Sequence, residues 1–158
     1  MTRPHPSQPN PAIQRLYQEA ELAWEQLDYP KSIHLIELAT RKDPRNPSLL
    51  LDLARAYGRR FDFPAAGRCL EKAVQISGNR AQTLAEAGQV CLQFDKIEMG
   101  IAYLERACQK KGVSIGTLTT LVDIYLRDRR IDEAAELLER YLFFTAAVPD
   151  RMPGGIEA

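Results

Sequence analysis

The sequence predicts an all-α fold, an α-solenoid of four antiparallel helix pairs, and three observations support this prediction. Apolar residues recur at a spacing of 34. Within each unit they follow a period of about 3.6 residues, which is typical of an amphipathic helix. Short segments separate the helical stretches, and a short join forces consecutive helices to lie antiparallel. Stacked repeats of this kind bury a continuous core that a single unit could not build alone.

Four columns of equivalent residues define the repeat. One is leucine in every unit, one is apolar in every unit, and two hold small residues, which allow helices to pack closely. The columns are Leu16, Leu50, Leu84 and Leu118; Ile36, Leu70, Leu104 and Leu138; Ser32, Ala66, Gly100 and Ala134; and Ala39, Ala73 and Ala107. They divide the chain into units 13–46, 47–80, 81–114 and 115–148. Flexible tails are expected at 1–12, which is rich in proline, and at 149–158.

Each unit is expected to contain two helices. The joins inside the units are short, at residues 27–30, 60–64 and 129–132. Pro30 and Pro64 suit the first turn of a second helix, where no backbone donor is lost. Residues that end helices recur between the units, at Pro44, Gly78 and Gly112.

The charge balance excludes a strong general attraction to nucleic acid or to anionic lipid. The 158 residues include 21 Lys plus Arg and 21 Asp plus Glu, and the isoelectric point is about 6.7. No segment has a signal-peptide core or approaches the ~20 apolar residues that span a bilayer. We therefore expect a cytoplasmic protein with neither nucleic-acid nor membrane partners.

No catalytic, cofactor or metal site is expected. Cys69, Cys91 and Cys108 lack the spacing of metal ligands and are typical of buried thiols in a reducing compartment. The two histidines, His5 and His34, have no nucleophile or carboxylate at a recognisable spacing, and phosphate-binding glycine motifs are absent. Three glutamates on one side of the last helix indicate a solvated face: Glu133, Glu136 and Glu139.

These residues resemble the tetratricopeptide repeat (TPR) family, whose unit is a 34-residue helix pair with small residues at the eighth, twentieth and twenty-seventh places. The best matches are the segments 28–33 and 131–135, and the eighth place holds Ala20, Ala54, Gly88 and Val122. The resemblance covers residues 13–148 and implies a right-handed superhelix. Unit four also resembles the pentatricopeptide RNA-binding repeat, but the strict spacing and neutral charge argue against that alternative.

The resemblance implies a non-catalytic scaffold that binds a peptide or protein segment in a concave groove. The groove residues carried over from the family's places are Tyr17, Glu21, Trp24, Asp52, Arg55, Arg59, Glu86, Gln89, Gln93, Thr120, Asp123 and Arg127. Tyr17, Trp24 and Leu51 are expected to form an apolar anchor at one end. The alternative for each of these residues is simple solvation of its helix or, for Trp24, packing under the N-terminal tail.

One known site of the family is not expected here, the basic clamp that holds the carboxylate of chaperone C-terminal peptides. In units one to three its places hold Tyr17, Glu21, Asp52, Gln82 and Glu86. In units two to four they hold Leu51, Arg55, Glu86, Gly116 and Thr120. Neither set can clamp a carboxylate, so a peptide of mixed or modestly basic character is the better expectation.

Three alternatives to a simple adaptor remain open. The repeats could be the accessory region of a longer, transferase-type enzyme, since no polar cap follows unit four. The chain also resembles bacterial secretion chaperones in length and helical repeats. Finally, it could self-associate as a homo-oligomer through an aromatic patch at its last helix, formed by Tyr141, Leu142, Phe143 and Phe144.

Overall fold

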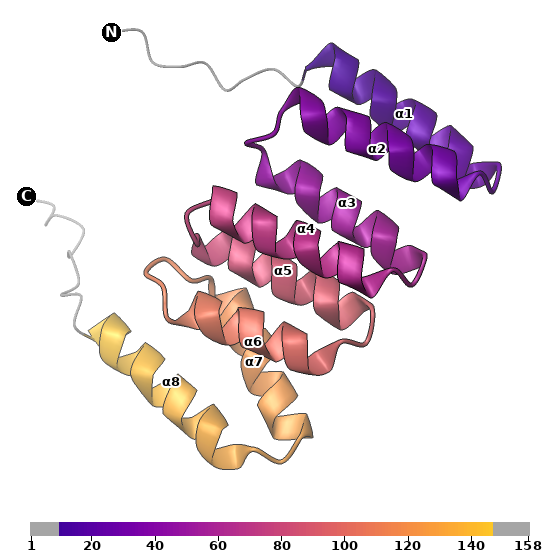
Figure 1. The fold of residues 1–158 in the computed structure, drawn as a ribbon. Helices are drawn as coiled ribbons and strands as arrows, with labels where there is room; N and C mark the ends of the chain where they lie inside the picture. Colours follow the sequence, from indigo (N-terminus) through magenta and orange to yellow (C-terminus); the bar gives the residue numbers. More distant parts are fainter. Residues whose placement is uncertain (1–9, 147–158) are drawn as a thin grey trace, which may run out of the picture. The chain divides into compact units, whose positions relative to one another are not determined.

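Eight α-helices and no strand occur in residues 10–146, the part of the chain that the computed structural model describes; side chains are described for residues 10–143 (Figure 1). The helices are α1 (Pro11–Glu25), α2 (Tyr29–Lys42), α3 (Pro47–Arg59), α4 (Phe63–Ile76), α5 (Ala81–Gln93), α6 (Ile97–Cys108), α7 (Ile115–Arg127) and α8 (Ile131–Ala146). The predicted all-α helical repeat fold is confirmed, with two helices in each 34-residue unit.

The chain divides into two compact units, Met1–Val113 and Ser114–Ala158. The first unit holds α1 to α6, and the second holds α7 and α8. The division falls one residue before the end of the third sequence repeat. The predicted tail at 149–158 and residues 1–9 of the other tail lie outside the described residues. The right-handed superhelical course of the chain stays a prediction.

Side-chain caps and prolines start the helices of the first two repeats. Asn10 and Asn46 precede Pro11 and Pro47, and each asparagine side chain accepts a backbone N–H from the first turn, at 3.0 and 3.1 Å. Because Asn10 caps α1, this helix begins two residues before Ile13, within the segment expected to be a tail.

The second helix of each of these repeats begins in a similar way. Asp28 and Asp62 accept the backbone N–H groups of Lys31 and Ala65, at 3.3 and 3.1 Å. Pro30 and Pro64 lie in the first turns that follow, as predicted.

The same backbone turn joins the two helices of every repeat. One residue of the turn has a left-handed conformation, and the next residue donates its N–H to a carbonyl five residues back, as in a Schellman motif. The hydrogen bonds join Asp28 to Ala23 (2.8 Å), Asp62 to Tyr57 (3.0 Å), Lys96 to Cys91 (2.9 Å) and Arg130 to Tyr125 (2.8 Å). The turn therefore repeats at the sequence period.

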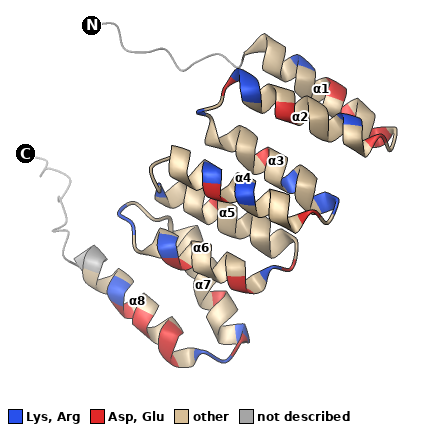
Figure 2. Ribbon diagram, viewed as in Figure 1, with Lys and Arg blue, Asp and Glu red and all other residues tan. Residues whose placement is uncertain are grey.

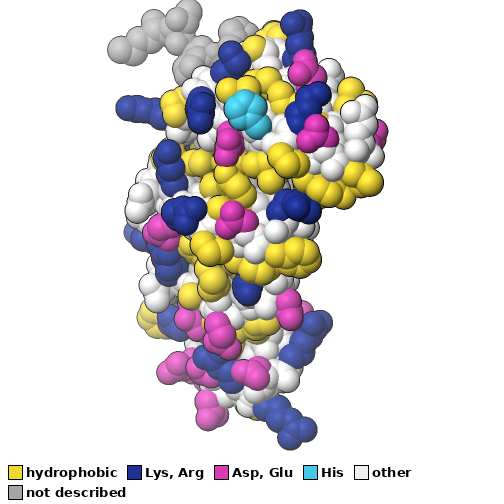
Figure 3. Space-filling view, turned by 45° about the vertical axis from the view of Figure 1, so that its right-hand side comes forward, with side chains coloured by type: hydrophobic (Ala, Val, Ile, Leu, Met, Phe, Trp, Pro, Cys, Tyr) yellow, Lys and Arg dark blue, Asp and Glu magenta, His cyan; other side chains and the backbone are white. Residues whose placement is uncertain are grey.

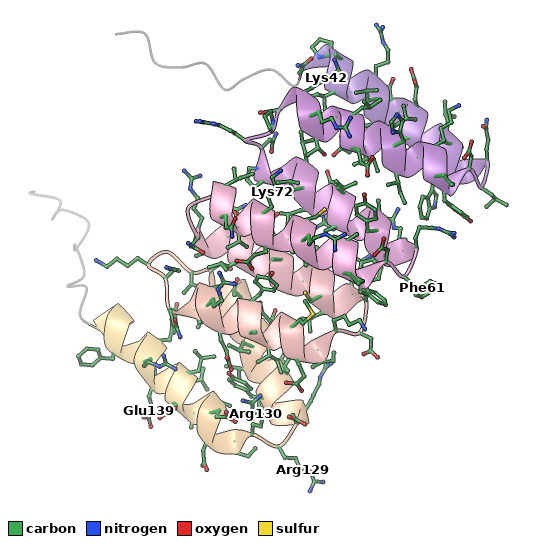
Figure 4. All side chains as sticks on the ribbon, in the orientation of Figure 1. Lys42, Phe61, Lys72, Arg129, Arg130 and Glu139 are labelled. Carbon is green, nitrogen blue, oxygen red and sulfur yellow. The ribbon has the colours of Figure 1, made fainter. Side chains whose placement is uncertain are left out.

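The left-handed residues of these turns are not glycines. They are Leu27, Phe61, Asp95 and Arg129, with φ between 59° and 62°. This conformation costs a residue with a Cβ roughly 1–2 kcal/mol. Leu27 and Phe61 are also 70% and 80% exposed, and Figure 4 shows Phe61 projecting away from the ribbon. Burial therefore offsets little of the strain at these two turns.

Stacking of α3 to α6 builds the main core of the first unit. The predicted columns enter it, since Leu84, Leu104, Ala73 and Ala107 are completely buried. The helices of the third repeat cross closely at Gly88, because a Cβ added there would lie 2.9 Å from Leu104 Cγ. The small-residue columns thus set how near the paired helices can approach.

The second unit is a helical hairpin with its own apolar contact surface. Leu118, Leu121, Val122 and Leu137 are buried in it. Leu138, although part of an apolar column, is 45% exposed. Its equivalent Leu104 is covered in the first unit, whereas no described helix follows α8.

We predict that Leu27→Gly stabilises the protein. Glycine removes the left-handed strain, and the lost leucine side chain is 70% exposed. After the greater entropy of glycine in the unfolded chain is subtracted, the free energy of unfolding should rise by about 0.5–1 kcal/mol. Urea denaturation followed by circular dichroism measures this difference.

Leu22→Gly is the matched control, because Leu22 is 55% exposed but lies inside α1. That change should lower the free energy of unfolding by about 1 kcal/mol. If both substitutions destabilise the protein to the same extent, the left-handed turn at Leu27 is not strained.

Candidate functional site

Two layers of helices make up the first unit. Contacts between α3 and α5 join the odd-numbered helices, and the hydroxyl of Tyr103 on α6 donates to Glu71 on α4 at 3.1 Å, which joins the even-numbered ones. Most of the predicted groove residues lie on α1, α3 and α5 at helical spacings of three, four or seven, so each set shares one face of its helix. We call this surface the odd-helix face; its predicted members are Tyr17, Glu21, Trp24, Asp52, Arg55, Arg59, Glu86, Gln89 and Gln93.

A polar network at the centre of this face joins the first two repeats. The Tyr17 hydroxyl on α1 donates to Asp52 Oδ2 on α3 at 3.0 Å. Arg55 donates to the other oxygen, Asp52 Oδ1, at 2.9 Å. The side chains of Arg55 and Asp52 remain 33% and 41% exposed. Three predicted residues therefore meet, and their polar atoms are held in place while part of each faces solvent.

An aromatic and cationic pair lies near the ends of the same two helices. The ring of Trp24 packs against Tyr29, with centroids 4.6 Å apart, and the Arg59 guanidinium lies 5.2 Å from the centroid of the Trp24 ring. This separation is within the range of a cation–π contact. Trp24 thus packs against the second helix of its own repeat and against α3.

The remaining predicted residues of the odd-helix face make fewer contacts with other helices. Glu21, Gln89 and Gln93 are exposed. Glu86 is half-buried and accepts a hydrogen bond from Gln82 Nε2 on the same helix at 3.1 Å. These side chains leave polar groups at the surface, with a formal charge of −2 from the two carboxylates.

The expectation that Leu51 forms part of an apolar anchor is wrong. Leu51 is only 2% exposed and belongs to the core cluster. On the next turn Ala54 is completely buried as well. Because α3 contacts α2, α4 and α5, a larger part of its circumference is buried than in a helix at the end of the stack.

The other predicted groove residues belong to the second unit. Thr120 is half-buried and donates to the carbonyl of Gly116 at 2.8 Å, while Asp123 and Arg127 are exposed. Asp123 also lines a small, mainly apolar cavity of about 130 Å³ between α7 and α8.

The predicted self-association patch lies on α8. Leu142 and Phe143 are 62% and 73% exposed, while Tyr141 is half-buried and lines the cavity of the second unit. The side chain of Phe144 lies outside the described residues. The surface carries both signs of charge, and Figure 2 shows acidic and basic residues interspersed along α4 and α8.

The sequence prediction missed a cleft on the other side of the first unit. It has a volume of about 320 Å³ and is lined by Glu37, Thr40, Arg41, Pro44, Leu50, Leu53, Tyr57, Ala65, Arg68, Cys69 and Lys72. These residues come from α2, α3, α4 and the start of the join after α2. Comparing the repeats place by place, rather than looking for shared residues, would have drawn attention to Cys69.

Tyrosine–carboxylate pairs recur through the first unit and respond to pH. Tyr57 on α3 donates to Glu37 on α2. Burial, followed by this hydrogen bond, raises the pKa of Tyr57 to about 12. Burial and the neighbouring Asp52 also raise the pKa of Tyr17. Each pair links helices of different repeats, so its loss should weaken their stacking.

We predict that stability falls as the pH rises from about 10 to about 12. In the unfolded chain a tyrosine ionises near pH 10, whereas folded Tyr57 keeps its proton up to about pH 12. The stabilisation is complete below the unfolded pKa and is lost as pH rises through the folded pKa. Urea midpoints from pH 8 to 12 measure the decline, which Tyr57→Phe should reduce; an identical decline in the variant would contradict the prediction.

Among the described residues, no group of three His, Cys, Asp or Glu side chains could hold a metal ion. Within that same part of the chain, every helix is too short or too polar to cross a bilayer.

A curated relative supports the resemblance to repeat proteins. The mouse protein interferon-induced protein with tetratricopeptide repeats 2 is 28% identical to this chain over 145 residues, which cover 84% of the chain and 29% of the relative. The chain therefore spans less than a third of that relative's length. No protein-family model matches the chain.

Solved structures of repeat proteins share the fold. The MamA protein aligns with a TM-score of 0.54 and 20% identity, over 87% of this chain and 75% of its own. The TPR domain of Sgt2 from Aspergillus fumigatus aligns with a TM-score of 0.54 and 21% identity, over 99% and 97%. The first TPR of Spaghetti (RPAP3), bound to the HSP90 peptide SRMEEVD, aligns at 0.52 and 21%, over 73% and 92%. Together with the helix pairs at 34-residue spacing, these similarities show that the chain has a helical-repeat fold of the kind found in tetratricopeptide repeat proteins.

Proposed function

We propose that the chain is a non-catalytic interaction scaffold that binds a peptide or protein segment on the odd-helix face. The observation that carries this proposal is the network of Tyr17, Asp52 and Arg55, which joins two repeats and remains partly exposed. Such a network is well suited to recognition, because its side chains are ordered before a partner arrives.

The unused hydrogen-bond donors of the network determine which groups of a partner it could bind. Arg55 uses one N–H to reach Asp52, and a guanidinium has five such donors in a planar fork. The others can bind a backbone carbonyl or a carboxylate of a partner. The indole of Trp24, covered on one side by Arg59, offers apolar contact area on the same face.

The surrounding charges favour a partner of mixed or modestly basic character. Two acidic residues of the odd-helix face lie near the network in the fold, Glu21 on α1 and Glu86 on α5. Among the described residues, neither carboxylate takes part in a salt bridge. A basic side chain of the partner could contact either carboxylate, while Arg55 contacts an acceptor.

This expectation differs from what is seen in one structural neighbour. The Spaghetti domain is bound to an acidic HSP90 peptide. In this chain the odd-helix face carries the carboxylates of Asp52 and Glu86, which would repel the carboxylates of such a peptide. We therefore expect a different class of segment.

A selection experiment tests the proposal. Random 12-residue peptides displayed on phage are selected on the wild-type chain, and the dissociation constants of the enriched peptides are measured by fluorescence anisotropy. The double variant Arg55→Glu, Arg59→Glu should weaken their binding by about tenfold or more, since it reverses two charges and removes the contact with Trp24.

Lys31→Glu, Arg45→Glu is the matched control, because it makes the same change in charge at exposed positions away from the face. Circular dichroism checks that each variant is folded. Peptides that bind the two double variants equally well, or a selection that enriches none, would contradict the proposal.

A second candidate function is self-association through α8. The exposure of Leu142 and Phe143 favours it, since adjacent apolar side chains that face solvent are typical of contact surfaces. Sedimentation velocity over a range of concentrations should show a monomer–oligomer equilibrium that Leu142→Asp, Phe143→Asp abolishes. A wild-type chain that sediments as a monomer at every concentration would remove this candidate.

The length of the curated relative leaves a role within a larger protein as an alternative. The chain matches 29% of that relative, so the repeats could serve as the accessory region of a longer enzyme or of another multi-repeat protein. A chaperone of the bacterial secretion type is a further alternative. Each of these roles would still use the odd-helix face for a protein segment.

A further inference from the structure

An alignment of the repeats with one another explains why a cleft lies between α2 and α4. Cys69 on α4 is equivalent to Tyr103 on α6, since the two lie 34 residues apart. Tyr103 is 7% exposed and donates to Glu71 on the preceding even helix at 3.1 Å. It therefore fills the space between α4 and α6, whereas the small Cys69 leaves the corresponding space beside α2 open.

The charges around the two junctions differ in the same way. Glu71 is contacted by the Tyr103 hydroxyl and by Arg106, whose Nη1 lies 3.5 Å from the carboxylate. Its equivalent Glu37 instead accepts a hydrogen bond from Tyr57 on α3. Lys72, which is equivalent to Arg106, has no salt bridge to Glu37.

Three cations consequently line the cleft without a carboxylate partner. Arg41, Arg68 and Lys72 are exposed, and within residues 10–143 none of them takes part in a salt bridge. With Glu37 included, the formal charge of the lining is +2. In the next junction the places of Arg41 and Arg68 hold Gln75 and Ala102, so this charge belongs to one junction of the unit.

The floor of the cleft is apolar. Leu50 and Leu53 of α3 lie there, at 3% and 6% exposed, beside Pro44 and Ala65. Figure 3 shows one face of the molecule, on which hydrophobic surface lies beside Lys and Arg side chains. A volume of about 320 Å³ is at the lower end of the range for ligand sites.

We propose that this cleft is a second binding site, which takes a peptide segment with a bulky aliphatic side chain flanked by carboxylates. The aliphatic side chain would lie on the leucine floor, and the carboxylates would pair with Arg41, Arg68 and Lys72. A free small anion would use the cations but leave the apolar floor exposed, so the combination favours a peptide. The site is distinct from the odd-helix face, and its partner has the opposite charge character.

The test uses the full chain and a phage-displayed library of random 12-residue peptides. Selection is performed on the Arg55→Glu, Arg59→Glu variant, so that ligands of the odd-helix face are disfavoured. The enriched peptides should be acidic, should contain Leu, Ile or Met, and should protect Cys69 from alkylation by iodoacetamide, as read by mass spectrometry at pH 8.5. Because burial raises the pKa of the Cys69 thiol, alkaline conditions are needed for labelling.

Two variants then locate the binding. Arg68→Glu, Lys72→Glu should weaken it by about tenfold or more, because attraction at the rim becomes repulsion. Cys69→Tyr reproduces the side chain of the next repeat, so it should fill the cleft, remove binding and leave the circular dichroism spectrum unchanged. Lys110→Glu, Lys111→Glu is the charge-matched control outside the cleft and should keep the wild-type affinity.

Each outcome decides the proposal. Binding that Cys69→Tyr abolishes and that protects Cys69 from alkylation supports it. Acidic peptides that bind equally to Arg68→Glu, Lys72→Glu, peptides without an aliphatic side chain that bind equally well, or a selection that enriches no acidic peptide would overturn it. These results do not depend on the odd-helix face, so either proposal can fail while the other stands.

Discussion

The close crossing of two helices within each repeat is the constraint on which the rest of the structure depends. At Gly88 and Gly100 no larger side chain fits without displacing Leu104 or Leu92, and at Ala73 and Ala107 the small side chains are completely buried. Helices that approach this closely bring the leucines of α3, α4 and α5 into the main core of the first unit. The repeated left-handed turn then returns the chain at the same place in every unit. Strict spacing in the sequence is therefore a packing requirement.

Differences between equivalent places create the surfaces that can recognise partners. Tyr103 fills the space between α4 and α6. The smaller Cys69, at the equivalent place, leaves the space between α2 and α4 open. On the opposite layer, Asp52 gains a tyrosine and an arginine as partners, while its equivalent Glu86 bonds to a glutamine of its own helix. The scaffold stays constant while single substitutions change shape and charge. The odd-helix face and the cleft therefore favour partners of opposite charge.

The fold was largely predictable from the sequence, because helix formation and stacking depend on patterns that the sequence displays directly. The period of the apolar residues, the small-residue columns and the prolines in first turns all correspond to described helices. The polar residues of the candidate site were predicted from the places that face the groove in the family that the sequence resembles, and their role in binding stays a prediction. Their partners were not found, because the contacts of Tyr17 with Asp52 and of Arg59 with Trp24 join residues of different repeats.

The sequence by itself established the repeat length and the helix pairs, because both follow from local periodicity, while its resemblance to a known family suggested the candidate face. Only the tertiary structure decided which side chains are available. Leu51 occupies a groove place yet is buried, since α3 is covered by three neighbouring helices. Cys69 looks unremarkable in the sequence, yet it leaves a cleft lined by three cations, since the space depends on what α2, α3 and α4 together fail to fill. Burial and open space are properties of several helices at once, which no single segment encodes.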